Sequence, residues 1–151
     1  GPERVEFNNY VFTETHQGWR GYSDNNEILL SSDPRNLNPA AVPDITLSEL
    51  SSASKIYFTL NPEDNLQTTF AYFDANIRPR LGSFIPACTK DVEACKELPL
   101  INCDNASPSI KVIQVSLSNQ SSATYENNCL LVQGNQFQIP LFFDSLILKL
   151  S

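Results

Sequence analysis

The stretch from Lys55 to Leu81, KIYFTLNPEDNLQTTFAYFDANIRPRL, decides the fold of this chain. Its first six residues are mainly β-branched or aromatic and stop at Asn61-Pro62, which is typical of a buried strand and its end. From Leu66 the apolar residues recur every three or four positions, so they share one face of a helix. Because Pro79 lacks the amide hydrogen that a helix interior uses, we expect a kink or an early end near Ile77.

The chain before this unit predicts a meander of short strands. Residues 3–14 are expected to form one strand with a bulge or bend at Asn8-Asn9, where the apolar alternation changes phase. Further strands are expected at 19–22 and 27–31, with a turn at 24–26 between them. A meander of this kind is expected at the edge of a sheet.

A short helix should precede the central strand, because Thr46-Leu-Ser-Glu49 matches a capping box. After the central unit, strands are expected at 98–102, 110–117, 123–126 and 129–132, the last two joined at Asn127-Asn128 by a tight turn or a bulge. The end of the chain predicts a second long helix, because apolar pairs recur every four residues. These are Phe142, Phe143, Leu146, Ile147 and Leu150, with Asp144, Ser145 and Lys149 on the other face.

Strands alternating with helices favour a single α+β or α/β domain. We expect a mixed β-sheet with the long central helix and the C-terminal helix packed on it. The alternative is an all-β sandwich, which would require residues 66–81 to form a strand. The predicted core contains Tyr57 or Phe58, Leu60, Phe70, Phe73, Ile77, Val112 or Ile113, Phe142 or Phe143, Leu146 and Ile147.

The four cysteines lie between residues 88 and 129, and none shows the paired spacing of a zinc site. We therefore predict two disulfides and an oxidising, extracytoplasmic compartment. Three pairings are open in principle; the cheapest local closure favours Cys88–Cys95, which leaves Cys103–Cys129. Asn119-Gln-Ser is a glycosylation sequon, and Asn105-Ala-Ser is a second that Pro108 weakens.

The net charge of −7 at pH 7 argues against nucleic acid and against anionic lipid as partners. The chain lacks methionine, and Gly1-Pro2 resembles the scar of a removed expression tag, so residues 3–151 are expected to be one domain. No run of apolar residues is long enough to span a membrane, and we expect any N-terminal signal or anchor to have been removed.

No residue pattern names a reaction, and no cofactor motif is present in the sequence. His16 lies in a predicted turn, and the carboxylate pairs Glu63-Asp64, Asp91/Glu93 and Asp24/Glu27 lack the pattern of a calcium loop. Trp19 and Tyr22 flank Arg20 and are candidate binding residues, because aromatic residues with arginine often anchor interfaces. For Trp19 we favour a place at the edge of the core.

The second half of the chain, from about Asp44 onward, resembles uncharacterised membrane-anchored exported proteins of the small-genome DPANN archaea. The resemblance rests on Ile56-Tyr-Phe-Thr-Leu-Asn-Pro62, Asn76-Ile-Arg-Pro79, Leu98-Pro-Leu-Ile-Asn-Cys103, Asn128-Cys-Leu-Leu-Val-Gln-Gly134 and Phe143-Asp-Ser-Leu-Ile-Leu148. It implies export, an N-terminal anchor and disulfides, and it supplies no catalytic residue.

These observations predict a non-enzymatic, membrane-tethered ectodomain that acts as a structural or attachment module and contacts protein or glycan at a cell surface. The first alternative is an envelope-directed hydrolase that uses a carboxylate pair. The second is a small-ligand-binding domain with its site near 61–65, at the carboxyl end of the central strand, where ligand crevices of α/β sheets lie.

Overall fold

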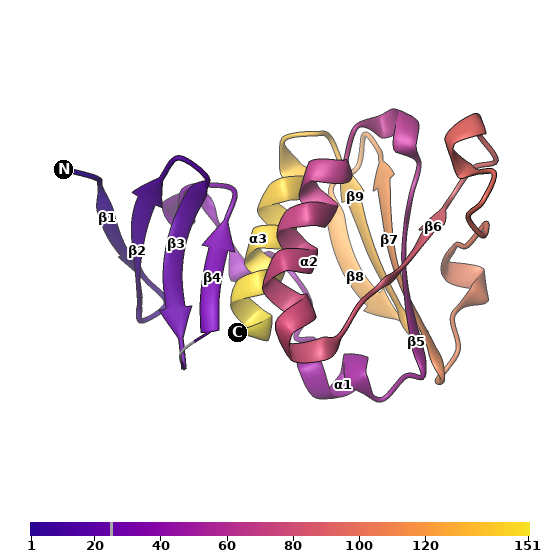
Figure 1. Cartoon of the computed structure of the whole chain (residues 1–151), viewed down its shortest axis with the longest axis horizontal. Coiled ribbons are helices and arrows are strands. Elements are labelled where there is room, and N and C mark those ends of the chain that lie inside the picture. Colours follow the sequence, from indigo (N-terminus) through magenta and orange to yellow (C-terminus); the bar gives the residue numbers. More distant parts are fainter. Residues whose placement is uncertain (25) are drawn as a thin grey trace.

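The computed structural model describes residues 1–24 and 26–151, which form three layers (Figure 1). A four-stranded antiparallel sheet contains β1 (Arg4–Phe7), β2 (Tyr10–Thr15), β3 (Gly18–Ser23) and β4 (Asn26–Leu30), in that order. The middle layer contains α2 (Gln67–Leu81) and α3 (Gln138–Leu150), and the short α1 (Leu47–Ser51) lies at one end. The third layer is a five-stranded mixed sheet of β5 (Lys55–Leu60), β6 (Ile85–Cys88), β7 (Ile110–Leu117), β8 (Ser122–Glu126) and β9 (Cys129–Gly134).

The mixed sheet has the strand order β6-β5-β7-β9-β8. Neighbouring strands are parallel except for β8, which runs antiparallel to β9. Helix α2 connects the parallel strands β5 and β6, and α3 follows β9, so that both helices cover one face of the sheet (Figure 1). The predicted single α+β domain is confirmed, but with two sheets in place of one.

Aromatic rings fill the space between the mixed sheet and its helices. Phe73 of α2 and Phe143 of α3 meet edge to face, with ring centroids 5.1 Å apart. Phe58 of β5 lies against both rings and within 4.7 Å of Phe70. The predicted cluster is confirmed: Phe58, Leu60, Phe73, Ile77, Ile113, Phe143, Leu146 and Ile147 are buried, and Phe70 packs against them.

Helix α2 runs on to Leu81, so the predicted early end near Ile77 is wrong. Pro79 lies in the last turn on the exposed side, where water can satisfy the carbonyl that loses its helical partner. The amide of Gly82 then donates to the carbonyl of Arg78 and closes the helix end.

The N-terminal meander differs from the prediction in two ways. Asn8 and Asn9 have φ values of 51° and 66° and form a tight hairpin turn, so residues 3–14 are two strands and contain no bulge. The meander is a separate sheet, where we expected the edge of the main one. The predicted turn at 24–26 includes residue 25, which lies outside the described residues.

Two polar side chains hold this meander against the middle layer. Asn76 of α2 accepts a hydrogen bond from the Leu29 amide and donates one to the Leu29 carbonyl, each 2.8 Å long. Asp144 of α3 accepts bonds from the backbone amides of Ser31 and Ser32 and from the Ser31 hydroxyl, at 2.9–3.1 Å. The helices thus act as the missing neighbour of the edge strand β4.

Asp144 and Ser145 are only 1% and 2% exposed, so the prediction that they cover a solvent face of the helix is wrong. The physical reason is the three-layer arrangement: α3 lies between two sheets and is covered on both sides (Figure 1). Burial, the largest effect, raises the pKa of Asp144 to about 6, against the lowering effect of its bonds to Ser31 and Ser32.

Both predicted disulfides are confirmed, Cys88–Cys95 and Cys103–Cys129. The second ties the segment after β6 to β9 on the outer side of the mixed sheet. In this segment the Ile101 carbonyl accepts a 2.8 Å hydrogen bond from the Thr59 hydroxyl. Two disulfides are consistent with an extracellular protein in an oxidising environment.

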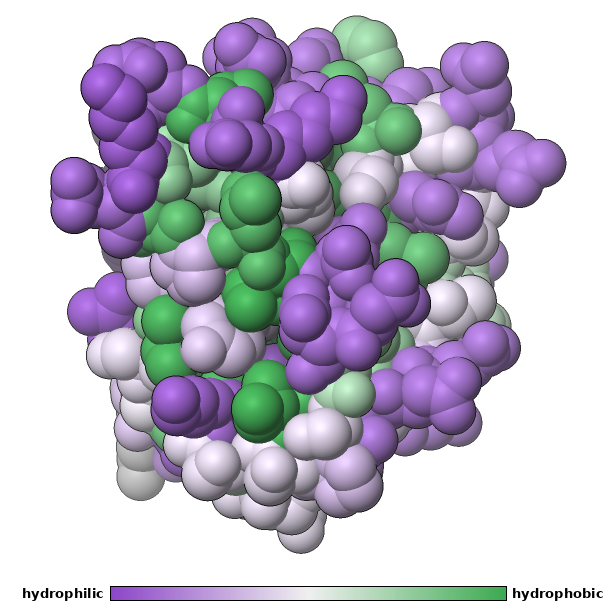
Figure 2. Space-filling view, turned by 90° about the vertical axis from the view of Figure 1, so that its right-hand side faces the viewer, coloured by the Kyte–Doolittle hydropathy of each residue, from purple (hydrophilic) through white to green (hydrophobic). Residues whose placement is uncertain are grey.

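The segment after β6 contains two short 3-10 turns, at 93–95 and 103–105, and an isolated bridge between Cys88 and Leu100, so the strand predicted at 98–102 is wrong. Strand β6, which contains Pro86, was not predicted. On this side of the molecule, hydrophobic residues form a broken line between hydrophilic ones (Figure 2). Within the described part of the chain, no helix combines the length and apolar character that crossing a membrane requires.

Candidate functional site

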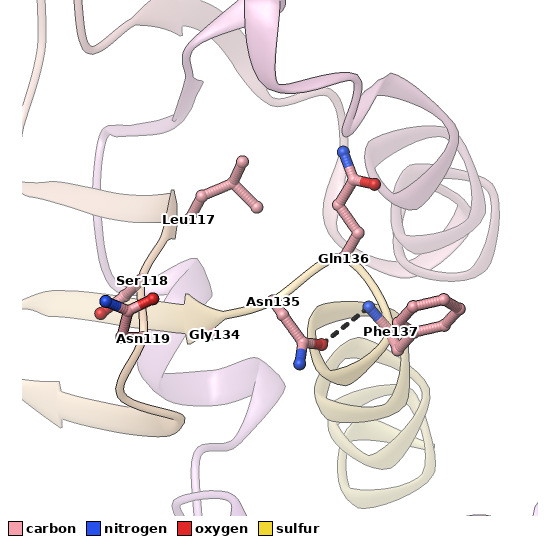
Figure 3. Close-up of a pocket in the computed structure, with 7 residues that line it drawn as sticks. All are labelled: Leu117, Ser118, Asn119, Gly134, Asn135, Gln136 and Phe137. Atoms are coloured by element: carbon pink, nitrogen blue, oxygen red, sulfur yellow. Dashed lines mark hydrogen bonds between the residues drawn. The ribbon is translucent and has the colours of Figure 1, made fainter.

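A hollow of about 580 Å³ lies where the chain leaves the parallel strands β7 and β9 (Figure 3). Ligand crevices of α/β sheets lie outside such carboxyl ends. The hollow is bounded on one side by the turn after β7 and on the other by the turn from β9 into α3. Its lining residues are Leu117, Ser118, Asn119, Gly134, Asn135, Gln136 and Phe137.

Phe137 is 85% exposed, more than any other large hydrophobic residue in the described part of the chain. Its ring projects away from the body of α3 (Figure 3). By contrast, Ile139, two residues later, is fully buried. Leu117, on the opposite wall of the hollow, is 41% exposed. An apolar side chain left in water beside a hollow is typical of a contact residue, although single exposed residues of this kind also occur without a role.

The start of α3 is held by reciprocal side-chain bonds. The Asn135 side-chain oxygen accepts from the amides of Phe137 and Gln138, both at 2.9 Å, and the Gln138 side chain accepts from the Asn135 amide at 3.0 Å. This reciprocal pattern is that of a capping box formed just before α3, whose own N-cap is Phe137, and it occupies the amides of Phe137 and Gln138. Gly134 has a φ of 155°, and a Cβ there would lie 2.9 Å from the Gln138 side-chain oxygen, so the turn requires glycine.

A second hollow, of about 390 Å³, lies beyond Phe137. Gln136 and Phe137 line both hollows and form the wall between them, which we call the Phe137 ridge. The Gln136 side chain donates to the Asp64 carbonyl at 3.2 Å, which ties the ridge to the turn after β5. The second hollow is lined by Ser31, Asn65, Leu66, Thr68, Thr69, Tyr72, Gln136, Phe137 and Pro140.

The chemistry of both linings is neutral. Their polar side chains are hydroxyls and carboxamides, and among the described residues no Asp, Glu, Lys, Arg or His lines either hollow. Hydroxyl and amide groups both donate and accept hydrogen bonds, so they suit an uncharged ligand that is rich in hydroxyl groups.

The three predicted binding residues do not lie together. Trp19 is 7% exposed and belongs to the core, as we favoured, with the Arg35 guanidinium 5.9 Å from its ring centroid. Because side chains alternate along β3, Arg20 and Tyr22 point to the opposite face. There Arg20 bonds Glu27 at 2.8 Å, and Tyr22 is 63% exposed.

The two predicted sequons occupy different settings. Asn119 is exposed in the turn after β7 and lines the first hollow. Asn105 is also exposed, but its side chain accepts a 2.9 Å hydrogen bond from the Asn102 amide within a short helical turn. Of the two sequon asparagines, Asn119 therefore lines the candidate site, whereas Asn105 is held by a local hydrogen bond.

The predicted carboxylate pairs lie in separate parts of the surface. Glu93 pairs with Lys96 at 2.7 Å, and Glu27 pairs with Arg20. A pair that was not predicted, Asp104 and Glu126, lines a hollow of about 380 Å³ beside Cys103–Cys129. Across residues 1–24 and 26–151, no group of three His, Cys, Asp or Glu side chains could hold a metal ion.

Sequence reasoning missed the Phe137 ridge, although two signals were present. Asn135 and Gln138 have the spacing of a capping box, which places the start of α3. Phe137 then falls outside the apolar face that contains Phe143, Leu146 and Ile147. An apolar residue out of phase with its own helix is expected to be exposed.

Comparison of the chain with protein-family models, curated proteins and solved structures finds no match.

Proposed function

We propose that this domain is an attachment module, tethered at a cell surface, that binds a neutral glycan across the Phe137 ridge. The single observation that carries the proposal is the exposed Phe137 ring between two uncharged hollows. The extracytoplasmic setting is supported by the two disulfides, and the tether by the sequence resemblance.

A sugar ring fits the chemistry of the ridge in two respects. Its C–H face is apolar and can lie on the Phe137 ring, as apolar groups do on exposed aromatic surfaces. Its hydroxyls can then bond the carboxamides of Gln136 and Asn119, which reach the same hollow. The absence of charge from both linings favours a neutral sugar over a phosphorylated or acidic one.

The test is binding of soluble neutral oligosaccharides, selected on an array and measured by calorimetry. Phe137→Ala should weaken the best binder about tenfold or more, because truncating an anchoring aromatic costs upwards of about 1–2 kcal/mol. Tyr22→Ala is the matched control: it removes an exposed aromatic ring from the other sheet and should leave the affinity unchanged. Failure of every neutral oligosaccharide to bind, or equal binding by Phe137→Ala, would refute the proposal.

A second candidate, the envelope-directed hydrolase, is favoured by one observation: Asp104 and Glu126 line the same hollow. Two carboxylates flanking a glycosidic bond are the usual machinery of glycoside hydrolysis. Its test is turnover of envelope glycans by the wild type and by Asp104→Asn and Glu126→Gln. Turnover that disappears in both variants while Phe137→Ala retains it would favour this function over attachment.

A further inference from the structure

Lys111, at the start of β7, is a buried amine that the Phe137 ridge does not use. Its side chain is 4% exposed, although lysine is almost never buried without a partner. Its Nζ donates to the Asn128 side-chain oxygen at 2.6 Å and lies 3.1 Å from a Glu49 carboxylate oxygen. The Tyr125 hydroxyl donates to the same Glu49 oxygen at 2.8 Å.

These groups come from separate elements that the fold brings to one point. Glu49 belongs to α1, Lys111 to β7, and Asn128 to the tight turn between β8 and β9. The predicted Thr46–Glu49 capping box forms only in part: the Thr46 hydroxyl accepts from the Glu49 amide at 3.0 Å, but the Glu49 carboxylate turns to Lys111 and Tyr125. The Glu49 carboxylate therefore contacts the Lys111 amine and does not cap the start of α1.

We propose that Lys111 and Asn128 become joined by an intramolecular isopeptide bond, with Glu49 as the proton relay. The Asn128 carbonyl carbon lies within about 4 Å of Nζ, since it is one C=O bond from the contacted oxygen. That separation is close to the range of about 3–3.5 Å from which bound groups react. A buried amine, a fixed amide and an adjacent carboxylate are the parts that such a bond requires.

The reaction balances without any added reagent. Glu49 first takes one proton from the Lys111 ammonium, and the neutral Nζ attacks the Asn128 carbonyl carbon. Glu49 passes its proton to the amide nitrogen and takes the second Nζ proton, and the tetrahedral intermediate collapses with loss of ammonia. Glu49 then gives this last proton to the ammonia, which leaves as ammonium. One C–N bond forms and one breaks, nothing is oxidised or reduced, and the product is an amide between the two side chains.

Proton transfer to Glu49 is a required step, because the amine is charged at rest. Burial, the largest effect, lowers the pKa of Lys111, but the bonds to Glu49 and Tyr125 outweigh it and leave the pKa raised. The hydrogen bond from Tyr125, which is the largest effect, and the contact with Lys111 lower the pKa of Glu49. The Glu49 carboxylate lies 3.1 Å from Nζ, within reach of its proton, so removal of Glu49 should stop the bond from forming even where Lys111 and Asn128 stay in place.

Asn128 is well placed to react, because its backbone is fixed on both sides. It has a φ of 66° in the hairpin turn, and its carbonyl accepts from the Val112 amide at 3.2 Å. The next residue, Cys129, is linked to Cys103. The isopeptide bond would add a second covalent tie at this hairpin, where β7, β8 and β9 begin or end.

The test is the intact mass of the purified, reduced protein followed by peptide mapping. The bond predicts a mass about 17 Da below that of the sequence, the mass of one ammonia, and a branched peptide that joins Lys111 to Asn128. Lys111→Arg and Glu49→Gln should both show the full mass. Asn128→Gly, which tolerates the positive φ of the turn, should also show it.

Two results would overturn the proposal. One is the full mass in the wild type. The other is a deficit of the same size with only linear peptides, which would mean that an asparagine has cyclised to a succinimide. Circular dichroism of each variant shows whether it folds, so that a full mass in a folded Lys111→Arg variant remains informative.

Discussion

The five-stranded sheet packs one whole face against α2 and α3, whereas the four-stranded sheet meets the same helices along the edge of β4. Phe58, Phe73 and Phe143 fill the first contact and exclude water from it. At the second contact, Ile28 and Leu30 are buried, but the strand edge is matched by the polar groups of Asn76 and Asp144. Apolar burial contributes a large free energy that does not depend on the direction of contact. A strand edge, in contrast, needs hydrogen-bond partners in fixed places.

The exposed aromatic residues Phe137 and Tyr22 lie in different halves of the molecule. Phe137 lies at the start of α3 beside the mixed sheet, and Tyr22 lies on the outer face of the meander. Functional side chains are positioned best on elements with well-packed support. The mixed-sheet half therefore carries both the candidate glycan site and the proposed cross-link.

The largest expected effect is on the packed face. Phe73→Ala removes a fully buried ring that touches Phe58, Phe84 and Phe143, and should lower the free energy of unfolding by about 3–5 kcal/mol. Urea denaturation followed by circular dichroism measures this. A loss below about 1 kcal/mol would mean that the packed face is less important than the strand-edge contacts.

The pH dependence of stability sharpens the comparison at the other contact. The pKa of Asp144 is raised from its ordinary 3.8 to about 6, chiefly by burial, so the folded state holds a proton that the unfolded state releases. This contribution is fully present below pH 3.8 and is lost as pH rises through about 6, by a total of about 3 kcal/mol.

Surface carboxylates act in the opposite sense. The pKa values of Asp33, Asp44 and Glu49 are lowered by their cationic or hydroxyl partners, so their contributions are lost only as pH falls through those lowered values. Stability should therefore be greatest in mildly acidic solution and decline toward pH 7. Asp144→Asn should abolish the decline between pH 4 and 7 in thermal melts, and an unchanged decline in that variant would assign it to another group.

The same contrast explains what could be predicted from the sequence. The period of Phe70, Phe73 and Ile77 reflects one large apolar face, so it predicted α2 and its core correctly. The spacing of the cysteines likewise predicted both disulfides. Such signals are local, or follow from apolar burial that any packing partner would provide.

The docking of the meander left no such signal. Asn76 and Asp144 look like solvent-facing residues on amphipathic helices, and only the placement of a second sheet makes them buried partners of β4. The Phe137 ridge is similar, since its second hollow joins the turn after β5 to the start of α3. Contacts between segments so distant in sequence depend on the whole topology and not on a local pattern.

The smallest expected effect concerns Asn76. Asn76→Ala leaves the Leu29 amide and carbonyl without their partner and should cost about 1–3 kcal/mol. The exposed Thr68, on the same helix, provides the control: Thr68→Ala should change stability by less than about 0.5 kcal/mol.

Amide hydrogen exchange of wild type and Asn76→Ala tests most directly whether these polar contacts hold the meander on a mixed sheet that is stable without them. Exchange should accelerate about five- to 150-fold at the amides of β3 and β4, the range that follows from a loss of about 1–3 kcal/mol. The amides of β5 and β7 should keep their wild-type protection. Equal acceleration in both sheets would contradict the account, because the two would then open as one unit.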